Sequence, residues 1–185
     1  MPKENRRVKI TKLLLTDSFL RLLAEKPLSH ITVKAICEDA DLNRSTYYQY
    51  YADPYDQMAK LKASIITEMT SYTELPQEER ISQETALYTV IKKTLDYMDS
   101  KKEMFRILLC TNGDISLQKD IQSIFAEKLV PLYFNPSTNK TALQEFIFIS
   151  SGSFGIIYYW LSIDTQISTG ELTAQITHFV KKFMS

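Results

Sequence analysis

The sequence is poor in glycine, cysteine and histidine: its 185 residues include four Gly, two Cys and two His. Few glycines leave few of the hairpin turns that an all-β fold needs. Two cysteines cannot build a disulfide framework, so Cys37 and Cys110 are interpreted as small buried hydrophobic residues rather than as a redox switch. His30 and His178 lie far apart, and no Cys/His/Asp spacing typical of a metal site accompanies them.

Motifs that hold phosphates or activate nucleophiles are also missing. The chain has no glycine-rich phosphate loop and no nucleophile elbow. Asp96, Asp99 and Glu103 are close in sequence, but a solvated, charged helix face explains them. We therefore expect no enzymatic activity, no cofactor and no metal.

Long hydrophobic runs are absent as well. The chain starts Met-Pro-Lys-Glu-Asn-Arg-Arg, without an apolar leader, and its most apolar stretch is Phe146 to Leu161. Serines and glycines interrupt this stretch between positions 150 and 155, and it is shorter than the roughly 20 residues of a membrane span. The sequence predicts a soluble, cytoplasmic protein without membrane contact.

Charge of one sign does not dominate either, since 22 Lys and Arg balance 22 Asp and Glu. This balance argues against a protein that coats nucleic acid indiscriminately. Residues 1–65 have 11 basic against 8 acidic side chains, and residues 66–185 have 11 against 14. The small basic excess therefore lies in the N-terminal part.

Apolar residues recur at helical spacing along most of the chain, which predicts an all-α fold of about nine helices. Lys26-Pro27 ends a first helix at 6–25, because the residue before a proline resists the helical region. Asp53 as N-cap and Pro54 at the first position start a helix at 54–72. Further helices are expected at 33–40, 44–51, 82–99, 101–110, 116–133 and 141–163, and from after Glu171 to about Met184.

The most informative segment is residues 31–51. Thr32 is suited to cap a first short helix, and Asn43 to cap a second. The break Asp41-Leu42-Asn43 separates them, and the apolar Leu42 can pack beneath both helices. Two short helices joined by a three-residue turn indicate a helix-turn-helix, whose second helix enters the major groove of DNA.

Side chains of the second helix are suited to that role. Arg44, Ser45 and Thr46 lie at its start, where base edges come within reach, and tyrosine hydroxyls after them can donate to phosphates. Two helix N-termini add backbone N–H groups. We expect Tyr51, and in part Tyr48, to be core aromatics instead. The predicted DNA-binding residues are Thr32, Val33, Asn43, Arg44, Ser45, Thr46, Tyr47, Tyr48 and Tyr50.

The run from Thr32 to Tyr51, followed by Ala52-Asp53-Pro54, resembles the signature of DNA-binding domains in the TetR (tetracycline repressor) family, most densely at 43–51. The resemblance covers roughly residues 8–68. It implies a DNA-binding domain at 1–53 with its motif at 31–50, a linking helix at 54–72, and a homodimer on a palindromic DNA operator. Asp41 departs from the family's usual Gly, and Pro54 from its common phosphate-binding Lys, so that phosphate contact is not carried over.

Residues 73–185 resemble the family in architecture, and residues 155–172 resemble C-terminal domains of TetR regulators from low-GC Gram-positive bacteria. This likeness implies a regulatory and dimerisation domain whose last two helices form a four-helix bundle with those of a second subunit. The predicted dimer-interface residues are Phe146, Ser150, Gly152, Phe154, Ile157, Trp160 and Phe179.

An aromatic and Met-rich group in this part is the candidate ligand pocket, although core packing is the alternative for each member. Its residues are Tyr97, Met98, Met104, Phe105, Phe125 and Tyr158, with Tyr88 also considered. The hypothesis is a repressor that leaves its DNA operator when a ligand binds. The ligand would change the separation of the two DNA-binding domains of the dimer, so that they no longer fit successive major grooves. The alternative is a co-activator or a regulator controlled by a protein partner, for which the acidic C-terminal part and Pro54 leave room.

Overall fold

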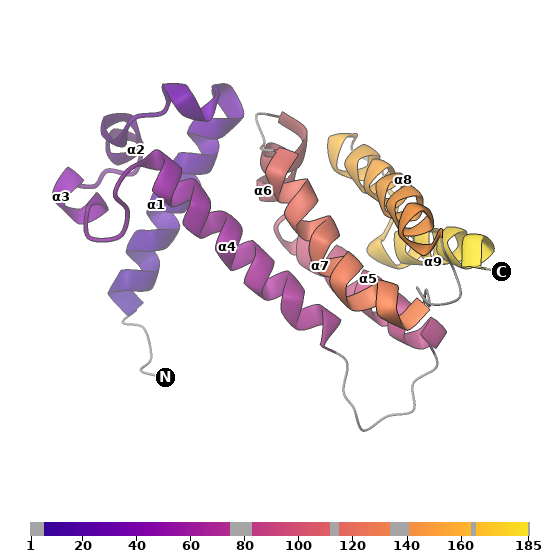
Figure 1. The fold of residues 1–185 in the computed structure, drawn as a ribbon. Coiled ribbons are helices and arrows are strands. Elements are labelled where there is room, and N and C mark those ends of the chain that lie inside the picture. The colour runs from indigo at the N-terminus through magenta and orange to yellow at the C-terminus, as the bar shows by residue number, and fades with distance from the viewer. Residues whose placement is uncertain (1–5, 75–82, 112–114, 134–140, 164–165, 185) are drawn as a thin grey trace. The chain divides into compact units, whose positions relative to one another are not determined.

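The computed structural model describes residues 6–74, 83–111, 115–133, 141–163 and 166–184 (Figure 1). These residues form nine α-helices and no strand, which confirms the all-α prediction. They divide into two compact units whose boundary lies inside one helix, between Ser64 and Ile65; Thr111 groups with the first unit.

The first unit is built from short helices around α1. Its elements are α1 (Arg6–Glu25), a 3-10 turn (Leu28–His30), α2 (Val33–Asp39), α3 (Arg44–Tyr47) and the first part of α4 (Pro54–Thr73). α1 packs on α2, and α2 packs on α3 (Figure 1). Phe19, Leu23, Ile36 and Tyr47 are fully buried at the centre of this unit.

Buried polar contacts orient α2 and α4 on α1. The Ser18 hydroxyl donates to the Ile36 carbonyl at 2.8 Å, and the Gln57 amide donates to the Leu15 carbonyl at 3.0 Å. Because both donors are buried, losing either bond would leave an unsatisfied polar group in the core. These two bonds therefore specify how α2 and α4 sit against α1.

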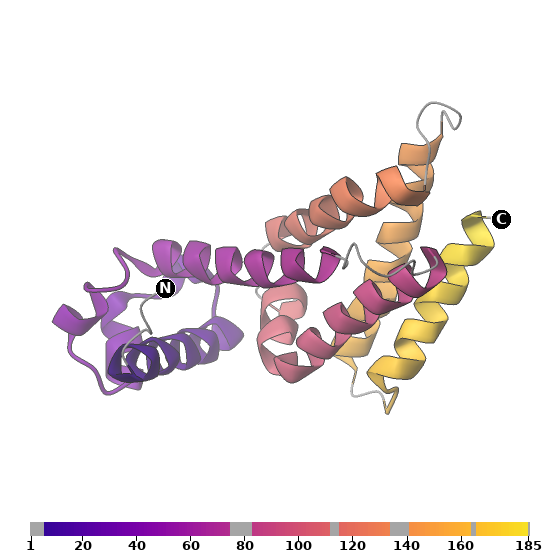
Figure 2. The same ribbon diagram turned by 90° about the horizontal axis from the view of Figure 1, so that it is seen from below.

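The second unit contains the rest of α4 and the helices that follow it. Its elements after α4 are α5 (Gln83–Ser100), α6 (Lys102–Arg106), a π-helical turn (Ile107–Thr111), α7 (Ile115–Tyr133), α8 (Ala142–Ser162) and α9 (Thr169–Met184). α5 packs lengthwise against α9 (Figure 2). The two helices are antiparallel, since the Thr169 hydroxyl at the start of α9 donates to Asp96 near the end of α5 at 2.7 Å.

Three helix bounds differ from the prediction. The second helix of the motif ends at Tyr47 rather than near Tyr51, because Gln49 N–H and Tyr50 N–H bond three residues back and tighten the chain into a turn. The helix expected at 101–110 becomes α6 followed by the π-helical turn. α9 begins earlier than expected because Ser168 and Glu171 form a capping box, with Ser168 N–H donating to Glu171 at 2.9 Å.

No helix in the described ranges is both long and apolar enough to cross a membrane.

Candidate nucleic-acid interface

The turn between α2 and α3 has the geometry that a helix-turn-helix needs. Thr32 caps α2 as predicted, its hydroxyl accepting from Ala35 N–H at 3.2 Å. Asp41 has a φ of 51°, the left-handed conformation that glycine adopts most easily and that Asp tolerates. Leu42 N–H then donates to the Cys37 carbonyl at 2.9 Å, which closes the turn. Asn43 occupies the N-cap position of α3 without a side-chain cap bond.

The orientation of α3 is set by Tyr47. This side chain is fully buried, and its ring lies 5.5 Å from that of Tyr51 and 5.8 Å from that of Tyr48. Tyr51 is also buried, which confirms that part of the prediction, whereas Tyr48 is 58% exposed and does not belong to the core. Of the neighbours Tyr47 and Tyr48, the first is therefore a core residue and the second is a surface residue.

Tyr47 was predicted to contact DNA, and this prediction is wrong. A fully buried phenol cannot reach a phosphate, and the hydroxyl of Tyr47 has no hydrogen-bond partner within the described residues. Burial, followed by the nearby carboxylate of Asp53, raises the pKa of this phenol well above its ordinary value. Tyr47 is an anchor that holds α3 on the core in its neutral form.

Most of the other predicted DNA-binding residues are accessible. Those with exposed side chains are Thr32, Asn43, Arg44, Ser45 and Tyr48, and those that are half-buried are Val33, Thr46 and Tyr50. Arg44 and Tyr48 are four positions apart and so share one face of the helical turn. Both side chains are exposed, whereas that of Tyr47 is buried.

Gln49 is an exposed residue that the prediction missed. It follows Ser45 by four positions and therefore extends the same accessible face. A glutamine amide can make two hydrogen bonds to adenine, as an arginine can to guanine. The four-residue spacing from Ser45 is the sequence feature that could have identified Gln49 as a DNA-binding candidate.

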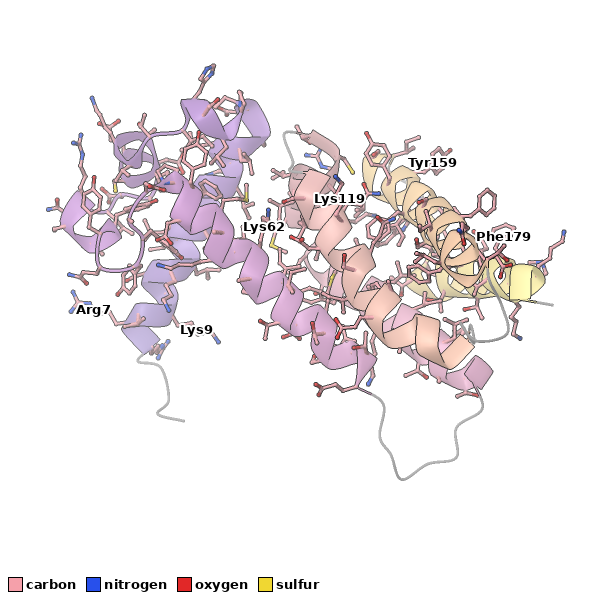
Figure 3. The ribbon with its side chains drawn as sticks, in the orientation of Figure 1. Arg7, Lys9, Lys62, Lys119, Tyr159 and Phe179 are labelled. Carbon is pink, nitrogen blue, oxygen red and sulfur yellow. The ribbon has the colours of Figure 1, made fainter. Side chains whose placement is uncertain are left out.

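Cations lie beside the end of this motif. Lys12 of α1 lies 5.8 Å from the centre of the Tyr50 ring, and Lys60 of α4 donates to the Tyr50 carbonyl at 2.8 Å. Arg7 and Lys9 project from the N-terminal end of α1 (Figure 3). Contacts through Tyr50 therefore bring basic residues of α1 and α4 next to the chain that follows α3, where a DNA backbone would meet positive charge.

The start of α4 is not suited to a phosphate. Asp53 accepts from Asp56 N–H at 2.8 Å, and Asp56 accepts from Ala52 N–H at 2.9 Å. The hydrogen bond from Lys60, then that from Ala52, lowers the pKa of Asp56, so its carboxylate stays ionised. Two carboxylates thus satisfy the helix N-terminus that would otherwise attract an anion, and Pro54 is buried behind them.

Cys37 lies beneath this motif, and burial raises the pKa of its thiol. Because the thiolate is the reactive form, this environment keeps Cys37 inert and agrees with its interpretation as a small hydrophobic residue. The described residues contain no group of three or more His, Cys, Asp or Glu that could hold a metal ion.

Solved structures share this fold at low sequence identity. A TetR transcriptional regulator from Streptococcus agalactiae matches with a TM-score of 0.62 at 18% identity, covering 95% of this chain and 96% of that one. A TetR-family regulator from Syntrophomonas wolfei matches at 0.63 and 14% identity, covering 95% of each chain. The fatty acid degradation regulator FadR from Bacillus halodurans matches at 0.63 and 13%, covering 96% of each.

A curated relative, the uncharacterised HTH-type transcriptional regulator YxbF of Bacillus subtilis, is 22% identical over 176 residues. The match covers 90% of this chain but only 43% of that protein's length. A family model described as the C-terminal region of transcriptional regulators, of the TetR type, matches residues 85–182, just over half of the chain. The chain belongs to the TetR family of transcriptional regulators. Members are DNA-binding proteins without enzymatic activity, in agreement with the motifs that the sequence lacks.

The second unit of this TetR regulator contains an apolar cavity between α5, α7, α8 and α9. Its volume is about 100 Å³. Large side chains that line it include Leu87, Leu95, Phe125, Phe146, Ile157 and Ile176.

Only one residue of the predicted ligand pocket, Phe125, lines this cavity. Met98 and Phe105 are fully buried elsewhere in the unit, and the ring of Tyr97 packs at 5.5 Å from Phe105. Met104 is half-buried and does not line the cavity, while Tyr158 and Tyr88 are exposed at the surface. Most of the aromatic and methionine residues predicted to line a ligand pocket therefore belong to the core or to the surface of the second unit.

The predicted dimer-interface residues also divide. Trp160 is buried, donating to the Ile167 carbonyl at 3.1 Å, and Phe146 and Ile157 face the cavity, so these three belong to the protomer's own core. Ser150 and Phe154 are half-buried and line the same cavity. Gly152 and Phe179 are exposed, as an interface requires.

Another face of α8 is apolar and accessible. We call it the outer α8 face: Ile147, Phe148, Gly152, Gly155, Tyr158 and Tyr159, all exposed. Tyr159 of α8 and Phe179 of α9 both lie on the side of these helices turned away from α7 (Figure 3). A side chain added at Gly152 or Gly155 would meet nothing within 4 Å, so another helix could approach closely there.

Proposed function

We propose that this TetR regulator binds a DNA operator through the accessible face of α3, as a homodimer, and represses transcription from it. The observation that supports this most directly is the orientation of α3. Tyr47 is buried, while the side chains of Arg44, Ser45, Tyr48 and Gln49 are exposed. A short helix anchored by one buried ring and presenting donors outward is suited to the major groove.

Dimerisation is proposed through the outer α8 face together with Phe179. Phe148, Tyr159 and Phe179 are 65%, 57% and 47% exposed, which is unusual for three large aromatic side chains on adjacent helices. A two-fold axis through this face would duplicate the reading surface, and a symmetric protein calls for a palindromic operator.

Release by a ligand is proposed to start from the cavity in the second unit. A ligand there would contact α5, α7, α8 and α9 together, including the two helices of the proposed interface. It would shift the equilibrium between dimer geometries only to the extent that it binds one of them more tightly. Control by a protein partner is not favoured, since the cavity accounts for regulation without one.

The test is binding to duplexes that tile the DNA upstream of the gene, measured by fluorescence anisotropy. We expect one duplex to bind at least about a thousandfold more tightly than a scrambled duplex, with two protomers per duplex. Its affinity should fall steeply with salt, because phosphate contacts release counterions. If no upstream duplex bound more tightly than the scrambled one, the proposed function would be wrong.

A further inference from the structure

We infer that Lys60 of α4 is a positioning residue for DNA recognition: its ammonium group holds the backbone that follows α3, and so places Gln49 and Tyr50, without itself contacting DNA. This inference rests on the proposed function in taking α3 and the residues directly after it as the DNA-reading surface. It follows from the shortness of α3, from the contacts that Lys60 makes, and from the exposure of its ion pair.

α3 is too short to place by itself the residues that follow it. The helix ends at Tyr47, whereas Gln49 and Tyr50 belong to the turn after it. Gln49 N–H donates to the Thr46 carbonyl at 3.3 Å, and Tyr50 N–H donates to the Tyr47 carbonyl at 2.9 Å. Carbonyl groups at and beyond the end of a helix need a donor from outside that helix. Lys60 supplies one to the Tyr50 carbonyl.

The ammonium group of Lys60 is engaged within the first unit. Its Nζ atom donates to the Tyr50 carbonyl at 2.8 Å and to Asp56 Oδ2 at 2.9 Å. The same atom lies 5.6 Å from the centre of the Tyr51 ring, where a cation is attracted to the ring face. A phosphate that drew the ammonium away from the two oxygens would break two charge-assisted hydrogen bonds to gain one. Lys60 is therefore better suited to support the DNA-binding surface than to bind a phosphate.

Asp56 completes the same attachment. Its Oδ2 atom accepts from Lys60 and also from Ala52 N–H at 2.9 Å. The two side chains are one helical turn apart on α4, and together they hold two backbone groups of one short segment, the carbonyl of Tyr50 and the N–H of Ala52. This segment comes directly after Gln49. Both attachments involve a charged side chain, and such hydrogen bonds are stronger than those between neutral groups.

The exposure of the pair separates its effect on stability from its effect on recognition. The side chain of Lys60 is 56% exposed and that of Asp56 is 29% exposed. Ion pairs this accessible contribute little to the free energy of unfolding. Base recognition is more demanding, because a hydrogen bond to a base edge requires a narrow range of distance and direction. Removal of the pair should therefore impair the reading of bases while the protein stays folded.

The test combines Lys60→Met with Asp56→Asn in the full chain. This double substitution removes one charge of each sign, and the asparagine oxygen can still accept from Ala52 N–H, so mainly the contact with the Tyr50 carbonyl is lost. Fluorescence anisotropy over a range of salt concentrations measures the affinity for the operator and for a scrambled duplex. Operator binding should weaken about tenfold, as for the loss of one base contact, and scrambled binding should change less than about twofold. The salt slope should stay the same, since no phosphate contact is removed.

Two single substitutions complete the set. Lys60→Met alone leaves Asp56 without its cation, which repels both duplexes alike, so the ratio of operator to scrambled affinity should fall by the same factor. Lys119→Met removes a lysine from an exposed position of α7 in the second unit and should leave that ratio unchanged. An equally large fall for Lys119→Met would show a general effect of lysine loss and would overturn the inference.

Equal losses on the two duplexes would also overturn it. A salt slope that fell by about one for Lys60→Met would then identify this lysine as a phosphate contact. An unchanged slope would indicate a loss of folded protein, which circular dichroism checks. An unchanged affinity ratio in both Lys60 variants would refute the positioning role and leave the proposed function intact. If the wild-type protein itself preferred no upstream duplex, the proposed function and the inference built on it would both be wrong.

Discussion

The two units of the molecule differ in what determines their structure. In the first unit named groups set where helices start and how the chain turns: Thr32 caps α2, Asp41 adopts the left-handed turn, and Asp53 caps α4. In the second unit a capping box starts α9, but α8, its longest helix, is apolar on most sides and has no side-chain cap bond. Capping residues show where a helix begins, whereas the apolar content of a helix does not by itself show which of its sides faces the core.

α8 illustrates the second case. Tyr159 is 57% exposed and Trp160, its neighbour, is 1% exposed. Aromatic or aliphatic residues occur on nearly every side of this helix, so helical periodicity cannot separate the cavity side from the outer α8 face.

The largest expected effect concerns that outer face. Gly155→Glu places a charge where nothing lies within 4 Å in the protomer, so the protomer should fold and gain about 0.5–1 kcal/mol from replacing a helical glycine. The dimer should separate in sedimentation velocity, and operator affinity should fall about 10²–10⁴-fold as the two heads become independent.

Ser123→Glu adds the same charge to an exposed position of α7 and serves as the matched control, which should leave the dimer intact. A Gly155→Glu protein that remained dimeric would exclude the outer α8 face as the interface.

The next effect separates the stabilities of the two units. Tyr47→Ala removes a fully buried ring and should cost about 3–5 kcal/mol. Because Trp160, the single tryptophan, lies in the second unit, its fluorescence reports that unit alone. In urea, circular dichroism should reveal early loss of helix while the Trp160 transition stays in place. A matching shift of both signals would mean that the units unfold together.

Tyr47→Phe is the conservative counterpart. It removes a buried hydroxyl that has no partner within the described residues, so stability should be unchanged or increased. A loss of more than about 1 kcal/mol would show that this hydroxyl is hydrogen-bonded in solution.

The smallest effect concerns the ion pair between α1 and α2. Arg21 Nε donates to Asp39 at 3.0 Å, and this bond lowers the pKa of Asp39. The folded state thus favours the carboxylate, and its contribution is present above the ordinary pKa of 3.8 and lost as pH falls through the lowered value. Asp39→Asn should cost less than about 1 kcal/mol at pH 7, because both side chains are partly exposed.

Urea titrations at pH 7 and at a pH below the lowered pKa of Asp39 check this sign. The two proteins should converge in acid, and a difference that grew in acid would contradict the assignment.

Sequence alone located the helices and the helix-turn-helix closely, because prolines, N-caps and the Asp41 turn act over a few residues. It wrongly predicted that Tyr47 faces DNA, because α3 is too short for the spacing of apolar residues to define its buried side. It also missed the cavity, which arises where α5, α7, α8 and α9 meet, and only one of the residues predicted to line it does so. Contacts between elements distant in sequence leave no local pattern.

The most direct test of the account is the ratio of operator to scrambled-DNA affinity for Arg44→Ala, with Tyr48→Phe beside it. If the accessible face of α3 reads bases, Arg44→Ala should lose about 1–3 kcal/mol on the operator and much less on scrambled DNA. Tyr48→Phe should weaken both duplexes similarly, because a phosphate contact has no sequence information. Equal losses on the two duplexes for Arg44→Ala would contradict the proposed reading role of α3.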